Sequence, residues 1–297
     1  MGFGTLHSAG VSVKFTVMSV AQATSSRTAY PTSPLAAFSC LWVRRQLIMH
    51  LARREVLSRY RGSFVGVLWS FVNPLVMLAI YTLVMGYFLH AKWAGTTNSL
   101  QYSIVLFSGL ILFNFLSECL TRAPGLVLAN PNYVRKIVFP LEVLPWVAIC
   151  AALFHTALSL VAWVVFDLIV YHTVHPTVLF LPLIVAPLAL VAVGLSWFLS
   201  AAGVFIRDVA QAVTLAVQAL MFLSPLFYEV KNVPPVFQRI LLANPLTFVI
   251  EQARTIMIAG SLPNFVGLGI YWLASLIVAW LGFVWFQRAR DGFADVM

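Results

Sequence analysis

Six long apolar segments constrain this chain more than any other feature of its sequence. A helix needs about 20 mainly apolar residues to cross the hydrocarbon core of a bilayer. Stretches that meet this requirement lie at 66–89, 102–121, 143–171, 177–205, 210–228 and 264–286. None of them shows the alternating ten-residue pattern that is typical of membrane β-barrels. The sequence therefore predicts an all-α integral membrane protein with six transmembrane helices.

Composition excludes a soluble domain. The chain is 61% hydrophobic and only 9% charged, whereas about 25% of the residues in a soluble domain are charged. The net charge of +9 lies mostly at the ends of apolar segments, which does not fit the spread-out basic face of a nucleic-acid-binding protein. The cysteines Cys40, Cys119 and Cys150 are widely scattered. Their spacing indicates neither a disulfide framework nor a metal site, and we interpret them as small apolar residues.

Basic residues in the connecting segments predict the orientation. Arginines and lysines gather before the first apolar segment, between the second and third, and after the sixth. The connection at 90–101 has only Lys92, and the one at 172–176 has none. Because connections rich in lysine and arginine stay in the cytoplasm, both termini are predicted to be cytoplasmic.

Two regions depart from the pattern of simple spans. Residues 1–40 are rich in Ser, Thr and Ala, and we interpret them as a disordered cytoplasmic extension or as the result of a start assigned too early. Residues 229–263 are too apolar for a plain outer loop, yet their two short helical patterns, 235–243 and 246–258, are too short to span. Irregular backbone at membrane depth must be buried in protein or line a cavity. We therefore predict a re-entrant hairpin between the fifth and sixth spans.

The sequence gives little support for catalysis by this chain. It has no G-x-x-x-x-G-K-[ST] loop for nucleotide phosphates and no H-E-x-x-H zinc motif. His172 and His175 stand in a predicted outer loop without a carboxylate or cysteine beside them, so no metal site is predicted. Two acids fall within spans, Glu118 and Asp167. Glu118 has the spacing to pair with Arg122 on one helix face, and Asp167 either binds a proton or reaches the membrane interface.

Three sequence blocks carry a resemblance to a known family. These are "RYRGSFVGVLWSFVNP" from Arg59 to Pro74, "NPNYVRKIVFPLEVLP" from Asn130 to Pro145, and "SPLFY…VP…NPLTFVIEQAR" between Ser224 and Arg254. Together they make residues 45–290 resemble the membrane subunits of type-2 ATP-binding-cassette exporters for polysaccharides, those of O-antigen and teichoic acid.

The resemblance implies the permease half of an exporter for a lipid-linked polysaccharide in the bacterial inner membrane. Such permeases are homodimers that work with a cytoplasmic ATPase subunit. ATP and magnesium are bound by that partner, so this chain is expected to have no cofactor and no enzymatic activity of its own. Membrane lipids and the glycan are the other expected partners, and nucleic acid is not one. A permease for a smaller lipid or drug and a non-transporting scaffold subunit of the cell envelope are the alternatives.

Two cytoplasmic segments are expected to matter for this function. Residues 41–62 look like the family's amphipathic interface helix, which would lie on the membrane before the transmembrane domain at 63–297. Its candidate residues are Arg53, Arg54, Glu55, Arg59, Tyr60 and Arg61. The connection at 122–142 resembles the loop that the ATPase binds in this family. A short helix is expected to begin there at Asn130-Pro131. Its candidate residues are Arg122, Asn130, Pro131, Asn132, Tyr133, Arg135 and Lys136.

Two further sets of residues are candidates on the substrate side. Sugar rings stack on aromatic faces, so aromatic residues of the first two spans are candidates for lining a channel, with ordinary packing or lipid contact as the alternative for each. They are Tyr81, Tyr87, Phe107, Phe113 and Phe115. The hairpin is a candidate outer gate, with a mere cap on the helix bundle as the alternative. Its residues are Pro234, Pro235, Arg239, Asn244, Pro245, Glu251 and Arg254, among which Glu251 and Arg254 have the spacing of a local pair.

Overall fold

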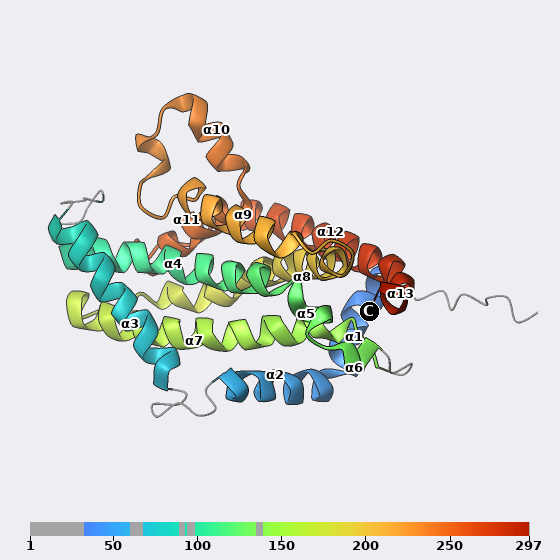
Figure 1. Ribbon diagram of the computed structural model, residues 1–297. Helices are drawn as coiled ribbons and strands as arrows, with labels where there is room; N and C mark the ends of the chain where they lie inside the picture. The colour runs from blue at the N-terminus through green and yellow to red at the C-terminus, as the bar shows by residue number, and fades with distance from the viewer. Residues whose placement is uncertain (1–32, 60–67, 89–92, 94–98, 135–138, 297) are drawn as a thin grey trace, which may run out of the picture. The chain divides into compact units, whose positions relative to one another are not determined.

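The regular structure of the chain is helical. The computed structural model describes residues 33–59, 68–88, 93, 99–134 and 139–296, and every regular element in these ranges is a helix (Figure 1). The all-α prediction is therefore confirmed for this part of the chain. Residues 1–32 lie outside the described ranges, whereas residues 34–40 already belong to the first helix, α1 (Pro34–Val43).

Four apolar helices are long enough to cross a membrane. They are α4 (Ser99–Arg122), α7 (Val143–Tyr171), the continuous helix made by η4 (Pro176–Phe180) and α8 (Leu181–Phe205), and α12 (Phe265–Ala289). Their bounds agree with four of the predicted spans. The other two predicted spans are shorter apolar helices: α3 (Trp69–Tyr81), which continues into the π-helix η3 (Thr82–Phe88), and α9 (Val209–Leu223). The long apolar helices support a membrane protein, and a count of six spans stays a prediction.

Helices α8 and α12 pack closely because glycines face one another at their contact. A Cβ added to Gly194 on α8 would lie 2.6 Å from the carbonyl oxygen of Val278 on α12. A Cβ added to Gly282 on α12 would meet the backbone of Gly194 in turn. Small residues of this kind let two backbones approach where apolar lipid provides no driving force for association.

Helix α4 is enclosed by its neighbours over most of its length. Over the most apolar 18 residues of this helix, 78% is buried. The indole nitrogen of Trp163 on α7 donates a hydrogen bond of 3.1 Å to the carbonyl oxygen of Ile104, which joins the two helices near the start of α4. A helix that is hydrophobic on all sides is expected to be buried in this way.

The segment after α9 forms two short helices, as predicted. They are α10 (Pro235–Ala243) and α11 (Pro245–Met257), with a short 3-10 turn, η5 (Val230–Asn232), before them. Asn244 ends α10 and begins α11, because its side-chain oxygen accepts a hydrogen bond of 2.9 Å from the amide of Leu246 while Pro245 occupies the first helical position. The depth of this pair in a membrane stays a prediction.

The remaining helices gather near one end of the long helices. They are α2 (Arg45–Arg59), α5 (Gly125–Leu128), α6 (Pro131–Val134), η6 (Arg290–Gly292) and α13 (Phe293–Val296). Helix α2 lies alongside the first half of α7 (Figure 1). Its Ile48 and Ala52 are buried there.

Candidate functional site

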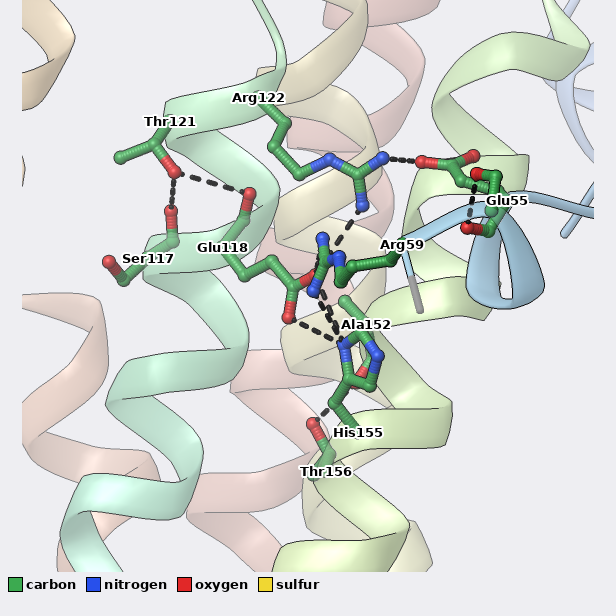
Figure 2. Close-up of polar contacts among 10 residues, drawn as sticks. Glu55, Arg59, Ser117, Glu118, Thr121, Arg122, Ala152, His155 and Thr156 are labelled. Carbon is green, nitrogen blue, oxygen red and sulfur yellow. Dashed lines mark hydrogen bonds and ion pairs between the residues drawn. The ribbon is translucent and has the colours of Figure 1, made fainter. Parts of the chain in front are cut away.

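Glu118 is the centre of a charged cluster at the C-terminal end of α4. Its carboxylate accepts a hydrogen bond of 2.8 Å from Arg59 at the end of α2 and lies 3.1 Å from Nδ1 of His155 on α7. Figure 2 shows these three side chains converging from three helices. Only 20% of the Glu118 side chain is exposed. Hydrogen bonds to an ionised group in such a place are stronger than neutral ones.

Arg122 extends the cluster by one helical turn. Its guanidinium lies 3.4 Å from the Glu118 carboxylate, so the pair predicted from the i,i+4 spacing is confirmed. A second nitrogen of the same guanidinium forms an ion pair with Glu55 of α2 (Figure 2). Two ion pairs, Arg59–Glu118 and Glu55–Arg122, therefore fasten α2 to α4.

The loop after α4 is fastened to α2 as well. Arg54 donates a hydrogen bond of 2.9 Å to the Tyr133 hydroxyl on α6, and the Tyr133 ring stacks on Phe139 at 4.1 Å between centroids. Helix α6 begins at Pro131, as predicted. The Asn130 side chain, however, points back and donates to the carbonyl oxygen of Leu126, so that it closes α5.

These contacts surround a groove of about 530 Å³ between α2 and the α5–α6 loop. Its walls come from α2, the end of α4, α5, α6, the start of α7 and the start of α9. The residues that line it are Leu51, Arg54, Glu55, Ser58, Thr121, Arg122, Gly125, Leu126, Ala129, Asn130, Tyr133, Leu144, Val147 and Ala210. The lining thus combines charged, small and apolar side chains.

The structure thus joins two sets of residues that the sequence predicted separately. From the predicted interface helix, Arg54 and Glu55 line the groove; from the predicted coupling loop, Arg122, Asn130 and Tyr133 do so. Arg53, Pro131 and Asn132 are exposed nearby. Four further predicted residues lie outside the described ranges: Tyr60, Arg61, Arg135 and Lys136.

Helix α2 runs alongside α7, and its predicted place on the membrane surface stays a prediction. Leu51 of α2 lines the groove together with Leu144 and Val147 of α7. Arg59 lies two turns further along α2, and it contacts His155, which lies two turns or more further along α7. Helix α2 therefore follows α7 instead of crossing it. At the end of α2, Arg59 is held by Glu118 and His155.

Sequence reasoning missed two contributors to this end of the molecule. His155 stands inside an uninterrupted apolar segment, which is a signal for a buried polar partner. Arg290 of η6 pairs with Glu142 at 2.8 Å and donates to the carbonyl oxygen of Phe139 at 3.0 Å. The C-terminal segment is thereby fixed to the loop that leads into α7.

The aromatic candidates on the first two predicted spans have two kinds of surroundings. The rings of Phe107, Phe113 and Phe115 are buried in the core around α4. Tyr81 is partly buried, and Tyr87 is 62% exposed. The structure therefore places the three phenylalanines in packing contacts inside one chain. Ordinary packing was the alternative to channel lining for each of them. Channel lining stays a prediction.

The candidate gate residues also fall into two groups, one exposed and one buried. Pro234, Pro235, Arg239 and Pro245 are exposed, and Asn244 joins α10 to α11. Arg254 is instead buried on α11, where its guanidinium donates to the carbonyl oxygens of Pro225 and Leu226 at 2.6 and 3.0 Å. Its hydrogen bonds go to backbone carbonyls, while Glu251 attracts it electrostatically, so the predicted local pair stays a prediction. Gate function stays a prediction.

Within the described residues, no group of three or more histidine, cysteine, aspartate or glutamate side chains has a geometry that could hold a metal ion. The charged cluster contains two acids, two arginines and one histidine, and every acid in it is already paired with a cation. We interpret the cluster as a set of ion pairs and hydrogen bonds that hold the helices together.

Comparison with known proteins identifies the family. Residues 46–258 match the sequence model of the ABC-2 type transporter membrane family, and the chain belongs to that family. The O-antigen export system permease protein RfbA of Klebsiella pneumoniae is 26% identical over 84% of this chain and 95% of its own length. The protein of the same name from Myxococcus xanthus is 24% identical over 86% and 96%. The polysialic acid transport protein KpsM of Escherichia coli is 24% identical over 84% and 95%.

Proposed function

We propose that this chain is the permease half of an ATP-driven exporter that moves a lipid-linked polysaccharide, similar to O-antigen, across the bacterial inner membrane. Membership of the ABC-2 family and similarity to polysaccharide permeases over nearly their whole length support this function. Two copies of the chain would form the membrane part, and a separate cytoplasmic subunit would bind ATP and magnesium.

The groove between α2 and the α5–α6 loop is the proposed docking site for the ATPase. The observation that carries this assignment is that the predicted interface helix and the predicted coupling loop meet there and are held together by Arg54–Tyr133 and Glu55–Arg122. A partner seated in the groove would push on α2, α4 and α7 at once, because the Glu118 cluster joins all three helices.

A six-span topology with cytoplasmic termini is part of the proposal. Helix α9 supports it, because Ala210 at its start lines the groove while Pro225, just past its end, accepts a hydrogen bond from Arg254 on α11. Its 15 residues span about 22 Å at 1.5 Å per residue. Helix α3 and the π-helix that follows it together make a second apolar segment that is shorter than the four long helices.

Gly125 allows a direct test of the docking site. It lines the groove, and a Cβ added to it would meet no atom within 4 Å. Gly125→Trp should therefore fill the groove without disturbing the fold and abolish co-purification of the ATPase. Gly269→Trp on α12 is the matched control, because that glycine also has open space around it. Normal recovery of the ATPase with Gly125→Trp would rule out docking in this groove.

The transport function is tested in cells. Loss of this chain should cause lipid-linked glycan to accumulate on the cytoplasmic side, and loss of the ATPase should have the same effect. If instead a small lipid or drug accumulates and glycan export is normal, the chain is a permease of the alternative class. If nothing accumulates, a scaffold role is favoured.

A further inference from the structure

A polar pocket of about 490 Å³ lies at the opposite end of α4 from the charged cluster. Its walls come from the start of α4, the end of α7, the segment after α9 and one face of α11. The residues with functional side chains that line it include Trp93, Tyr171, Glu229, Lys231, Glu251 and Thr255. Its volume is within the range of roughly 300–1,000 Å³ that is typical of small-molecule sites.

The floor of this pocket is rigid. Arg254 is only 8% exposed and donates to the carbonyl oxygens of Val105, Pro225 and Leu226 at 3.4, 2.6 and 3.0 Å. Its guanidinium also lies 4.3 Å from the centroid of the Trp93 ring. These contacts join α11 to α4 and to the segment after α9, so the pocket exists before any ligand arrives.

One wall is fixed by a helix end. Gly260, just after α11, has φ of 64°, and the amide of Ser261 donates to the carbonyl oxygen of Thr255 at 3.1 Å. A glycine in this left-handed conformation is a common residue just past the end of a helix. It holds Ile258 and Ala259 in place as part of the lining.

The charges of the pocket indicate a neutral ligand. Two carboxylates, Glu229 and Glu251, are balanced by Lys231 and Arg254, so the net charge of the four side chains is zero. The Arg254 guanidinium is already held by carbonyl oxygens, and the carboxylates repel a second anion. A pyrophosphate is therefore disfavoured, and an organic cation would in turn be repelled by Lys231 and Arg254.

Aromatic rings and hydrogen-bonding groups together match the chemistry of a sugar. Trp93 and Tyr171 present aromatic surface, on which the apolar C–H face of a pyranose can pack. Carboxylates accept hydrogen bonds from hydroxyl groups, and the Lys231 ammonium donates them. The Thr255 hydroxyl donates its own hydrogen to the carbonyl oxygen of Glu251 at 2.9 Å, so its oxygen can accept a further hydrogen bond. We propose that this pocket binds a neutral sugar unit of the polysaccharide as it leaves the permease at the outer face.

This inference rests on the proposed export function, and its location agrees with that function. Val105, in the pocket lining, and Arg122, in the charged cluster, are both on α4. The step of 17 positions from Val105 to Arg122 corresponds to about 25 Å at 1.5 Å per residue, close to the thickness of a hydrocarbon core. A pocket at that distance from the proposed cytoplasmic groove lies at the outer face.

Site-specific photocrosslinking during export tests the proposal. A photoreactive amino acid is placed at position 255, with position 230 as a second pocket position and Leu262, which is 62% exposed on the loop after α11, as the control. The probe is the cell's own lipid-linked glycan, detected on the purified chain by periodate oxidation and hydrazide labelling. We expect at least tenfold more sugar-bearing adduct from position 255 or 230 than from position 262. Glu229→Gln combined with Glu251→Gln should lower the adduct yield about fivefold, because charge-assisted hydrogen bonds are lost, whereas Asp291→Asn at the other end should not.

Several results would overturn the proposal. They are an absence of adduct at both pocket positions while export continues, equal yields at the pocket and at position 262, and an adduct without periodate-reactive sugar. An adduct that persists in cells unable to make the lipid-linked glycan would show that the ligand is a different molecule. Failure of the export function itself is distinguished by the deletion strain, because glycan would then not accumulate inside the cell when this chain is lost.

Discussion

Single residues decide how the part of the molecule around α11 is held together, and Arg254 is the clearest case. Burial lowers the pKa of its guanidinium to about 10, so it stays protonated at neutral pH. A buried charge is tolerated only when it is paired or hydrogen-bonded. Here backbone carbonyl oxygens from two other segments provide the hydrogen bonds.

Replacing Arg254 should therefore destabilise the fold. Arg254→Met leaves carbonyl oxygens without donors, each at a cost of about 1–3 kcal/mol. We expect a clear fall in the thermal unfolding midpoint of the detergent-purified protein. Arg254→Lys should recover only part of the loss, because an ammonium lacks the planar fork of donors. Arg239→Met on the exposed part of α10 is the control and should leave the midpoint unchanged; an equal fall in both would contradict the structural role of Arg254.

Cys40 on α1 illustrates a residue whose surroundings make it inert. Burial, with a smaller contribution from Glu142, raises the pKa of its thiol to about 12. At pH 8 roughly one thiol in ten thousand would be ionised, and the thiolate is the reactive form. In a variant with Cys119→Ser and Cys150→Ser, maleimide should label Cys40 only after denaturation. Rapid labelling of the folded protein at pH 8 would show that α1 does not bury this side chain.

At the scale of helices, α2 and α4 behave as one unit because of Glu118. Removing its charge leaves Arg59 and His155 without their acidic partner, and hydrogen bonds to charged groups contribute about 1.5–3 kcal/mol each. Glu118→Gln should therefore raise amide hydrogen exchange in residues 45–59 at least threefold. Arg53→Gln, on the same helix but exposed, is the matched control. Unchanged exchange in Glu118→Gln would show that α2 is held by its other contacts, with Arg122, Tyr133 and α7, and not by Glu118.

The same helices show which contacts a sequence can predict. Glu118–Arg122 and the junction at Asn244-Pro245 were predictable because both depend on residues close in the chain. Arg59–Glu118 and His155–Glu118 join positions 59 and 37 residues apart, so they depend on how α2, α4 and α7 pack. Phe107 and Phe113 were not distinguishable from lining residues for a similar reason: α4 is apolar all round, and no periodicity marks which face is buried.

At the scale of the whole molecule, the position of α9 decides the topology. If α9 spans the membrane, Asn132 and Leu262 lie on opposite sides; if it does not, they lie on the same side. Both side chains are exposed. In a cysteine-free background, Asn132→Cys should react with a membrane-impermeant maleimide only after the cells are opened, and Leu262→Cys should react in intact cells. Labelling of both from the same side would contradict the six-span arrangement.

The enclosure of α4 has a mechanical consequence. A helix packed on nearly all sides has no free face along which to bend or slide independently, since protein interiors are close-packed and transmit strain. Glu118 and Arg122 lie near its C-terminal end, and the carbonyl oxygen of Val105, near its N-terminal end, accepts a hydrogen bond from Arg254. We therefore expect a displacement imposed on one end of α4 to reach the other end as a rigid-body shift, so that α4 couples the charged cluster to the pocket at its opposite end.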